Sequence, residues 1–382
     1  MNLKKILQGS LILFTFIFFL ELWARLFPQW TPVWSEERKA RAEFALKHKT
    51  RPRHFYPGLG WVMKPKGLII STTRQEIVPL GEENIGIRDH SISTAPWAVV
   101  LGDSFAEGIG VTLDNIWIKQ LEKKLNKKII NLGQGGFTSN QYLVMLLKAK
   151  PYFKPAFVIC CIYKNDFNDR LATQSLDGIK ESDLPIWNIN SKMRYYGIWL
   201  LKNSFIYRLI RAPDILINDK KLKEKEEEVN HCKIEPFYHA DKNIHIFLTP
   251  FVLNNEVITY NIETPNWKKA VSLVSEDIKL IQQEVKKMDA KLVVLYFPSR
   301  EQSYTHLLEK KFKISSALDA PNNAIKYICE KYSIPFLDLT KPLRDESKKG
   351  KQLYLTFDGH WTREGNRFIS EKIAEWVSLI QE

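Results

Sequence analysis

The sequence is poor in cysteine and in recognisable metal-binding motifs. Four cysteines in 382 residues are too few for a disulfide scaffold, and the chain has neither a CxxC nor an HExxH motif. Cys160 and Cys161 lie side by side in an apolar run, so we expect them to pack on opposite faces of a strand. A bridge between Cys232 and Cys329 is left open by the spacing. We expect no metal site and no cofactor.

Also missing is the alternation of basic and aromatic residues that is typical of nucleic-acid-binding modules. The chain carries a formal net charge of +13. This charge suits an anionic envelope surface, but a lysine-rich composition with solvated side chains explains it equally well. We expect no nucleic-acid partner. With 45% hydrophobic and 26% charged residues, the chain is long enough for one main globular domain with a substantial core.

What the sequence does have, at its N-terminus, is a long hydrophobic run. After Lys4 and Lys5, residues 6–27 are almost wholly apolar. A helix of this length spans about 30 Å of hydrocarbon at about 1.5 Å per residue. Because no small-residue cleavage site follows, the pattern favours an uncleaved signal anchor. The short basic start predicts that the main domain lies on the extracytoplasmic, or periplasmic, side of the membrane.

Strand-like and helix-like patterns alternate over the main domain. Strands are predicted at residues 97–102, 128–133, 156–163, 291–297 and 333–338, and helices at 113–125, 138–149, 270–289, 321–332 and 364–379. This alternation favours βαβ units and a parallel sheet that is covered on both faces. We therefore divide the chain into a transmembrane helix at 1–27, a lead-in segment at 28–90, and a domain at 91–382 with an insertion at about 172–268.

Four polar motifs follow one another along this domain. They are GDSF at residues 102–105, NLGQGG at 131–136, KND at 164–166 and DGHW at 358–361. The first three directly follow apolar runs, where an open α/β sheet places its site. Each motif taken singly is also an ordinary turn or helix cap, but all of them in this order indicate an active site.

The residue types in these motifs suit acyl transfer by a serine nucleophile. A serine hydroxyl is a weak nucleophile at neutral pH and needs a base, a task for which the pKa of histidine is suited. We expect Ser104 to be the nucleophile, because it comes directly after a buried strand. Among the eight histidines, His360 is the best candidate for the base. Asp358 lies two residues before it and can orient its ring.

The order of the motifs resembles the SGNH, or GDSL, hydrolase superfamily, over roughly residues 84–380. The resemblance implies a catalytic triad of Ser104, His360 and Asp358. It implies an oxyanion hole formed by the backbone N–H groups of Ser104 and Gly136 and by the side chain of Asn165. It also implies a three-layer α/β/α, flavodoxin-like fold with a parallel central sheet.

Three further residues of the motifs, Asp103, Asn131 and Asp166, are assigned supporting positions. The chain departs from the family pattern at two places. Lys164 occupies the position where the family usually has a glycine, and Asp358 lies two residues before the histidine instead of three. The short spacing resembles membrane-anchored and O-acetyltransferase-like branches of the superfamily.

Together these features predict a membrane-anchored serine esterase that hydrolyses carboxylic esters. The expected substrate is an O-acetyl group on an envelope glycan. An O-acetyltransferase that modifies an envelope polysaccharide is the first alternative, and it would require an acyl-delivering membrane partner. A lipid esterase is another enzyme alternative. A non-catalytic glycan-binding or assembly protein is a fourth, and the intact serine, histidine and aspartate argue against it.

Overall fold

The structure is a computed structural model. It describes residues 9, 15–23, 26, 53–56, 59–64, 77–173, 237–240, 243–248, 262–310, 316–356 and 359–381. The chain divides into two compact units, one formed by Met1–Arg51 with Pro185–Lys233 and the other by Pro52–Leu184 with Ile234–Glu382. Nearly all described residues belong to the second unit.

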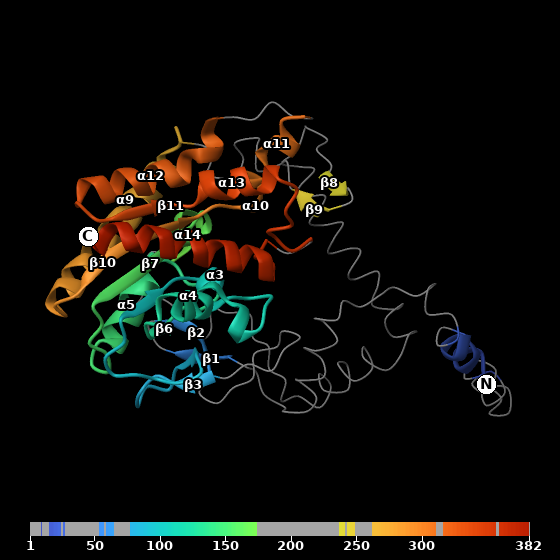
Figure 1. The fold of residues 1–382 in the computed structure, drawn as a ribbon. Helices are drawn as coiled ribbons and strands as arrows, with labels where there is room; N and C mark the ends of the chain where they lie inside the picture. Colours follow the sequence, from blue (N-terminus) through green and yellow to red (C-terminus); the bar gives the residue numbers. More distant parts are fainter. Residues whose placement is uncertain are drawn as a thin grey trace. The chain divides into compact units, whose positions relative to one another are not determined.

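The central sheet of this unit is wholly parallel. Its strands are β5 (Ala98–Leu101), β6 (Ile129–Asn131), β7 (Phe157–Tyr163), β10 (Lys291–Phe297) and β11 (Phe336–Asp338). They lie in the order β11-β10-β7-β5-β6 (Figure 1). Numbered along the chain from the other edge, this is the 2-1-3-4-5 order of flavodoxin-like sheets. The predicted parallel sheet is confirmed, and each strand lies within its predicted run.

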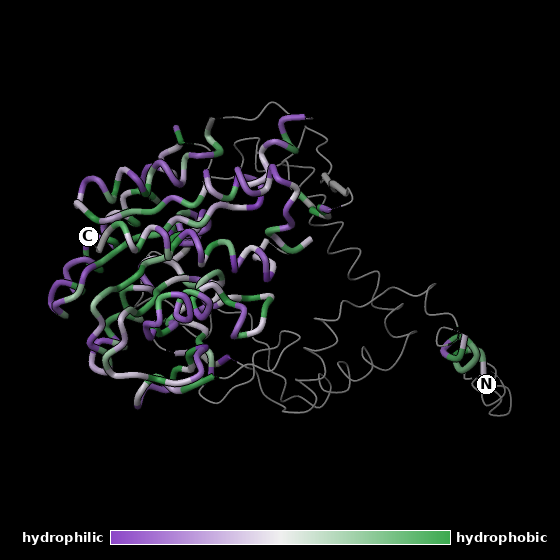
Figure 2. The backbone as a smooth tube through the Cα atoms, in the orientation of Figure 1, coloured by the Kyte–Doolittle hydropathy of each residue, from purple (hydrophilic) through white to green (hydrophobic). Residues whose placement is uncertain are grey.

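Helices cover both faces of the sheet. One face carries α5 (Ser139–Ala149), α9 (Pro265–Lys287) and α12 (Ala320–Lys331), and the other carries α4 (Trp117–Leu125) and α14 (Arg363–Gln381). Cys160 packs in the first core cluster and Cys161 in the second, as their alternation predicts. Figure 2 shows the hydrophobic residues gathered along the central strands. The layers are therefore α/β/α.

Local sequence signals explain where these helices begin. The hydroxyl of Thr264 accepts a hydrogen bond from the N–H of Trp267, and Pro265 occupies the first turn of α9. Thr138 and Gln141 form a capping box at α5. The helix predicted from residue 113 begins at Trp117 instead, because Ile116 is extended and follows a separate 3₁₀ turn, η2 (Leu113–Asn115).

The predicted lead-in segment contains a second sheet that the sequence did not indicate. Its strands are β1 (Arg53–Tyr56), β2 (Gly60–Met63), β3 (Ile77–Pro79) and β4 (Gly86–Arg88), paired antiparallel in the order β1-β2-β4-β3. Buried side chains of this segment, such as Val62 and Ile87, join the core cluster on the α5 face. Part of the lead-in thus belongs to the folded unit.

The remaining elements are short. They comprise α3 (Ser104–Glu107), α6 (Asn165–Ala172), β8 (Phe237–Ala240), β9 (His245–Leu248), α10 (Arg300–Ser303), α11 (Thr305–Leu308), η6 (Ser316–Asp319) and α13 (Thr340–Lys348). Strands β8 and β9 form an antiparallel hairpin. They lie within the predicted insertion, most of which falls outside the described residues.

The predicted membrane helix at residues 6–27 also lies largely outside the described part of the chain. Of this run, residues 9, 15–23 and 26 are described, and all are helical. Several of their large side chains are exposed, among them Phe16, Phe19 and Trp23. Among the described residues, no helix is both long enough and apolar enough to cross a bilayer.

Candidate active site

Ser104 is placed by the tight turn that joins β5 to α3. All four residues of β5 are buried, and the chain turns at Gly102 directly after it. A Cβ atom on Gly102 would lie 2.7 Å from the Cβ of Ala106 and 3.0 Å from that of Cys161, so only glycine fits there. The side chain of Asp103 accepts a hydrogen bond from the N–H of Phe105 at 2.9 Å and caps the helix. Ser104 is thereby fixed as the first residue of α3.

His360 reaches Ser104 from a loop 256 residues further along the chain. Its Nε2 atom lies 2.7 Å from the Oγ atom of Ser104. The loop is held by a hydrogen bond of 2.8 Å from the N–H of Leu355 to the carbonyl of His360. A bridge between Tyr354 and Trp361 closes it. The distance is that of a nucleophile and a base in hydrogen-bond contact.

Aromatic packing holds the histidine ring. The ring centroid of Phe105 lies 4.9 Å from that of His360 and 4.7 Å from that of Trp361. Phe297, at the end of β10, also lies 4.7 Å from Trp361. Three segments that are distant in the sequence thus meet in one cluster, which positions the imidazole over the nucleophile.

The predicted acid of the triad, Asp358, lies outside the described residues, so its role stays a prediction. Another carboxyl group, that of Asp103, is within electrostatic reach of His360. Burial raises the pKa of Asp103 to about 6, while the charge of a protonated His360 lowers it. Its Oδ2 atom has no hydrogen-bond partner among the described residues.

The predicted oxyanion donors lie at the same edge of the sheet as Ser104. Gly136 follows β6 and Asn165 follows β7, and these strands flank β5 on either side. Gly136 has a φ of +82°, a conformation that favours glycine, and a Cβ there would meet nothing within 4 Å. Within the described part of the chain, neither the N–H of Ser104 nor that of Gly136 donates a hydrogen bond. Both remain available to a ligand.

Asn165 is the first residue of α6. Its Nδ2 atom donates to Asp169 at 3.0 Å, which uses one of its two N–H bonds. Its Oδ1 atom is buried and has no partner among the described residues. The side chain thus keeps one N–H for a substrate oxygen.

Two of the predicted supporting residues hold the loops that follow the strands. Asn131 donates to the carbonyl of Ala106 and accepts from the N–H of Gly133, both at 2.9 Å. Asp166 accepts from the N–H of Tyr163 at 2.8 Å, and burial raises its pKa well above the usual value. Each side chain bonds to backbone groups that lie two or three residues from a predicted oxyanion donor.

Lys164, which departs from the family pattern, fits the local backbone. Its φ of −56° and ψ of −33° are right-handed helical angles, so the position does not require glycine. Its Nζ atom lies 3.7 Å from Oε2 of Glu301, and the other carboxylate oxygen, Oε1, accepts from Arg300 at 2.9 Å. Burial alone would raise the pKa of Glu301, but the two cations hold it below its usual value.

The four motifs did not point to a buried arginine that holds the nucleophile's helix. Arg88 is buried and donates to the carbonyl oxygens of Glu107, Gly108 and Val111, at the end of α3 and in the turn beyond it. Burial lowers its pKa to about 10, so it stays charged at neutral pH. Its neighbour Asp89 pairs with the buried Lys119 at 2.8 Å. A signal that could have found these residues is the segment NIGIRD at 84–89, in which an arginine and an aspartate directly follow Ile-Gly-Ile.

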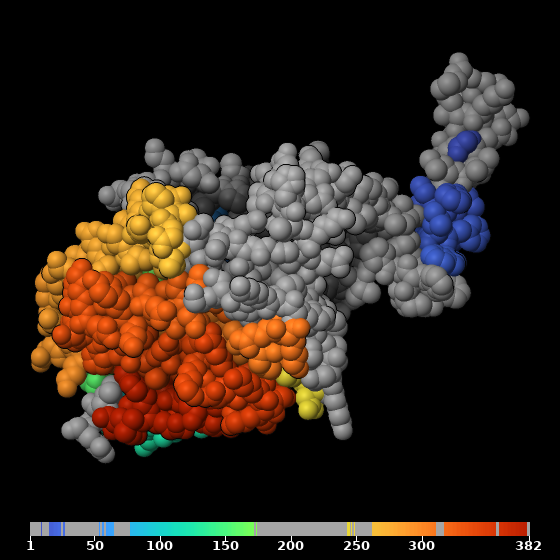
Figure 3. Space-filling view, turned by 90° about the horizontal axis from the view of Figure 1, so that it is seen from above, coloured from blue at the N-terminus to red at the C-terminus, as the bar shows by residue number. Residues whose placement is uncertain are grey.

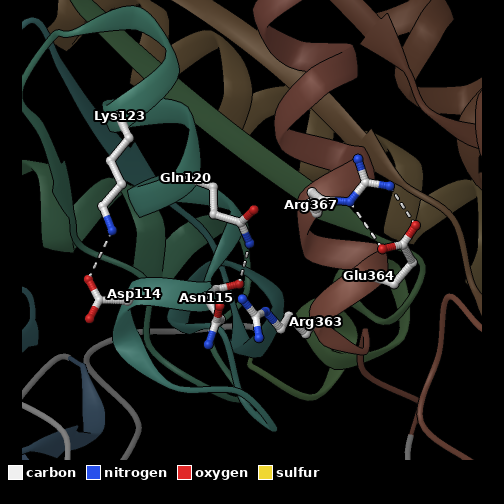
Figure 4. Close-up of a pocket in the computed structure, with 7 residues that line it drawn as sticks. All are labelled: Asp114, Asn115, Gln120, Lys123, Arg363, Glu364 and Arg367. Atoms are coloured by element: carbon white, nitrogen blue, oxygen red, sulfur yellow. Dashed lines mark hydrogen bonds and ion pairs between the residues drawn. The ribbon is translucent and has the colours of Figure 1, made fainter.

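A pocket of about 460 Å³ opens beside η2, α4 and the start of α14 (Figure 4). It is lined by Asp114, Asn115, Gln120, Lys123, Arg363, Glu364 and Arg367. Lys123 pairs with Asp114, and Arg367 with Glu364. Arg363 forms no ion pair within the described part of the chain. The pocket contains neither Ser104 nor His360, but Arg363 follows His360 by three residues.

The C-terminal part of the chain matches a known family. Residues 261–381 match the family described as "SGNH hydrolase-like domain, acetyltransferase AlgX". In Figure 3, elements of this region, coloured yellow-orange to red, form a continuous surface. The matched residues include His360, whereas Ser104, Gly136 and Asn165 precede them. No curated protein sequence is significantly similar to the chain.

Several solved structures have a similar but distant fold. They include the acetyl xylan esterase AlAXEase, with 11% identity, 74% of this chain and 98% of that chain covered and a TM-score of 0.40. A catalytic mutant of an acetylxylan esterase from Geobacillus stearothermophilus has 10% identity, covers 74% and 94% of the two chains, and has a TM-score of 0.38. A GDSL-like lipase from Bacteroides thetaiotaomicron has 12% identity, coverage of 75% and 89%, and a TM-score of 0.35.

At these TM-scores the solved structures support no conclusion about the activity. The family match over residues 261–381, the order of the strands and the contact between Ser104 and His360 are the observations that bear on the activity. Residues 261–381 therefore resemble an SGNH hydrolase-like domain, the type of domain that the order of the motifs predicted.

Proposed function

We propose that the protein cleaves carboxylic esters through an acyl intermediate on Ser104, with O-acetyl groups of an envelope glycan as the substrate. The observation that carries this proposal is the distance of 2.7 Å between Ser104 Oγ and His360 Nε2. A serine in hydrogen-bond contact with a histidine, next to unused backbone N–H groups, is the arrangement that acyl transfer requires.

In the proposed reaction, the hydroxyl of Ser104 donates its proton to Nε2 of His360 as Oγ attacks the ester carbonyl. The new C–O bond converts the carbonyl oxygen into an oxyanion. The backbone N–H groups of Ser104 and Gly136 and the amide of Asn165 stabilise this charge, and each such donor contributes about 3 to 4 kcal/mol in serine hydrolases. When the oxyanion collapses, the bond to the leaving alcohol breaks and His360 returns its proton to that alcohol.

The acyl group on Ser104 then goes to a second nucleophile, which His360 activates in the same way. If this nucleophile is water, the protein is an esterase. If it is a sugar hydroxyl, the protein is an O-acetyltransferase, and the description of the matched family as an acetyltransferase favours this second candidate. Transfer to a sugar would require a membrane partner that delivers the acyl group.

The N-terminal sequence supports a proposal for the location. We propose that residues 6–27 anchor the chain in a membrane and that the domain faces the extracytoplasmic or periplasmic side. The apolar run and its basic start support this arrangement. Carbonate extraction should leave the full chain in the membrane fraction, and protease added to intact spheroplasts should digest the domain. Protection from the protease would contradict the orientation.

Covalent labelling tests the intermediate. A fluorophosphonate probe should modify the purified protein at Ser104, and Ser104→Ala should abolish both labelling and turnover of a short-chain acetyl ester. Ser378→Ala, at an exposed position on α14, is the matched control and should behave as the wild type. Turnover by Ser104→Ala equal to that of the wild type would exclude the serine mechanism.

Product analysis then separates the two candidates. The protein is incubated with an activated acetyl ester and a candidate glycan, and free acetate is compared with acetylated sugar. Because water is present at about 55 M, transfer mainly to sugar requires a bound acceptor with a high effective molarity. Such a result would identify a transferase, and release of acetate alone would identify an esterase.

A further inference from the structure

The oxyanion loop, defined here as residues 133–136, lies directly against the helix that carries Ser104. A Cβ atom on Gly133 would lie 2.5 Å from the backbone nitrogen of Glu107 and 2.7 Å from the carbonyl carbon of Ala106. A Cβ on Gly135 would lie 3.1 Å from the carboxylate of Glu107. Gly133 and Gly135 therefore lie against the backbone of α3 and the carboxylate of Glu107, with no room for a Cβ atom on Gly133.

Glu107 links these two parts of the site. It is the last residue of α3 and is 1% exposed. Its Oε2 atom accepts a hydrogen bond of 2.5 Å from the N–H of Gly135, the residue before the predicted oxyanion donor Gly136. The carboxylate thus connects the helix of the nucleophile with the loop of the second donor.

The same carboxylate oxygen is paired with a cation from outside the α/β/α layers. Arg53, in strand β1 of the lead-in sheet, donates to Oε2 of Glu107 through Nη2. Through Nη1 it also donates to the carbonyl of Trp61 at 3.3 Å. A buried carboxylate is stable only when it is paired and hydrogen-bonded, and Arg53 supplies the opposite charge here.

A second side chain ties the loop to the lead-in sheet. Gln134 accepts from the N–H of Met63 at 3.1 Å and donates to the carbonyl of Gly86 at 2.8 Å. Its own N–H donates to the carbonyl of Gly102, next to the nucleophile's turn, at 3.0 Å. The N–H groups of residues 134 and 135 are therefore both engaged, whereas that of Gly136 donates to no described residue.

We propose that Glu107 and Arg53 are positioning residues that aim the Gly136 N–H at the oxyanion. Glu107 holds the loop through the Gly135 N–H, and Arg53 holds Glu107. This inference rests on the proposed function, because it assigns an orienting role within the same site. An oxyanion donor stabilises the transition state only when it is correctly placed, so loss of the tether lowers kcat and leaves KM nearly unchanged.

Substitution of Glu107 tests the inference. Glu107→Ala removes the acceptor of the Gly135 N–H and should lower kcat for a short-chain ester by about 10- to 100-fold, a part of the 10²- to 10³-fold loss on removal of a whole donor. KM should change less than about twofold. Glu107→Gln keeps a carbonyl oxygen for both donors and should retain kcat within about threefold, which makes it the conservative rescue.

Binding of a transition-state analogue supplies a readout that a purely structural role would not change. A phenylboronic acid forms a tetrahedral adduct with a serine Oγ, and its inhibition constant should rise in Glu107→Ala by the same factor as kcat falls. The matched control is Glu122→Ala, because Glu122 also accepts from a backbone N–H, that of Ile129, and from a lysine, Lys119, both at 2.9 Å. This control should lower thermal stability and leave kcat of the folded protein unchanged.

The outcomes distinguish this inference from the proposed function. If Ser104→Ala is inactive while Glu107→Ala keeps kcat and boronate affinity within twofold of the wild type, the positioning role is wrong and the serine mechanism stands. An equal loss in Glu122→Ala would also overturn it. If Glu107→Ala does not fold, Arg53→Met leaves the carboxylate in place without its cation, and a kcat equal to that of the wild type in the folded variant would contradict the proposal. Activity of Ser104→Ala would overturn the proposed function itself.

Discussion

The two halves of the candidate site are held in different ways. The half that carries Ser104 and the oxyanion loop is fixed by polar contacts, with Arg88, Asn131 and Glu107 bonded to backbone groups around α3. The half that carries His360 is fixed mainly by aromatic packing of Trp361 against Phe105 and Phe297. Polar contacts are directional and set the aim of N–H groups. Aromatic packing contributes stability and keeps the imidazole ring of His360 in contact with Ser104.

The largest expected effect comes from removing either member of the pair that joins the two halves. Ser104→Ala and His360→Ala should each lower kcat for a short-chain ester by at least about 10⁴-fold, because the two residues act as a unit. The double variant should be no slower than the slower single variant. Steady-state kinetics on purified proteins, with circular dichroism to confirm the fold, provide the check. Multiplicative losses in the double variant would indicate that the two residues act independently.

Truncation of Trp361 tests the aromatic half. Trp361 is buried, so Trp361→Ala should lower the free energy of unfolding by about 3 to 5 kcal/mol and should also lower kcat as His360 loses its support. Trp361→Phe should retain most of both. The control is Trp376→Ala, further along α14 and only partly buried, which should reduce stability without changing kcat. Urea unfolding and kinetics at a temperature where each variant is folded distinguish the two effects.

The pH dependence of the free energy of unfolding tests the half of the site that carries Ser104, through its neighbour Asp103. Burial raises the pKa of Asp103 from 3.8 to about 6. Below about pH 4 the group is protonated in both the folded and the unfolded chain. Between about pH 4 and 6 the unfolded chain ionises first, so this group lowers the free energy of unfolding by about 3 kcal/mol as pH rises, at 1.36 kcal/mol per pKa unit.

Asp103→Asn keeps the acceptor for the Phe105 N–H and cannot ionise. Relative to the wild type it should become more stable as pH rises from 4 to 7, and the difference should level off above about pH 6. Urea unfolding of both proteins across this range measures the difference. Parallel curves for the two proteins would contradict the assigned shift.

The smallest expected effect concerns Arg363 in the pocket beside η2, α4 and the start of α14. Arg363 lines it and forms no ion pair within the described residues, whereas Arg367 pairs with Glu364 and Glu371. Arg363→Ala should raise KM for an anionic ester substrate about threefold to tenfold, the size of one charge-assisted hydrogen bond, and should leave a small neutral ester unaffected. Arg367→Ala is the matched control. Equal KM values for wild type and Arg363→Ala on both substrates would exclude a role for this arginine in binding.

Much of the fold could be predicted because its signals are local. The five strands and the helices between them follow from apolar runs and periodicity, and the order of the motifs located Ser104 and His360, which the structure brings together. The lead-in sheet could not be predicted in this way. Its strands are three or four residues long, and their pairing depends on partners and on a core that belong to other segments.

The sequence by itself determined the parallel sheet, the placement of the serine after a buried strand and the pairing of residue types that acyl transfer requires. Only the tertiary structure decided which side chains hold these groups in place. Arg53 and Glu107 are 54 residues apart and Ser104 and His360 are 256 apart, and no local pattern encodes such contacts. The pair of Arg53 and Glu107 forms because a buried carboxylate needs a cation and a backbone donor, and the folded chain alone brings both to the same oxygen.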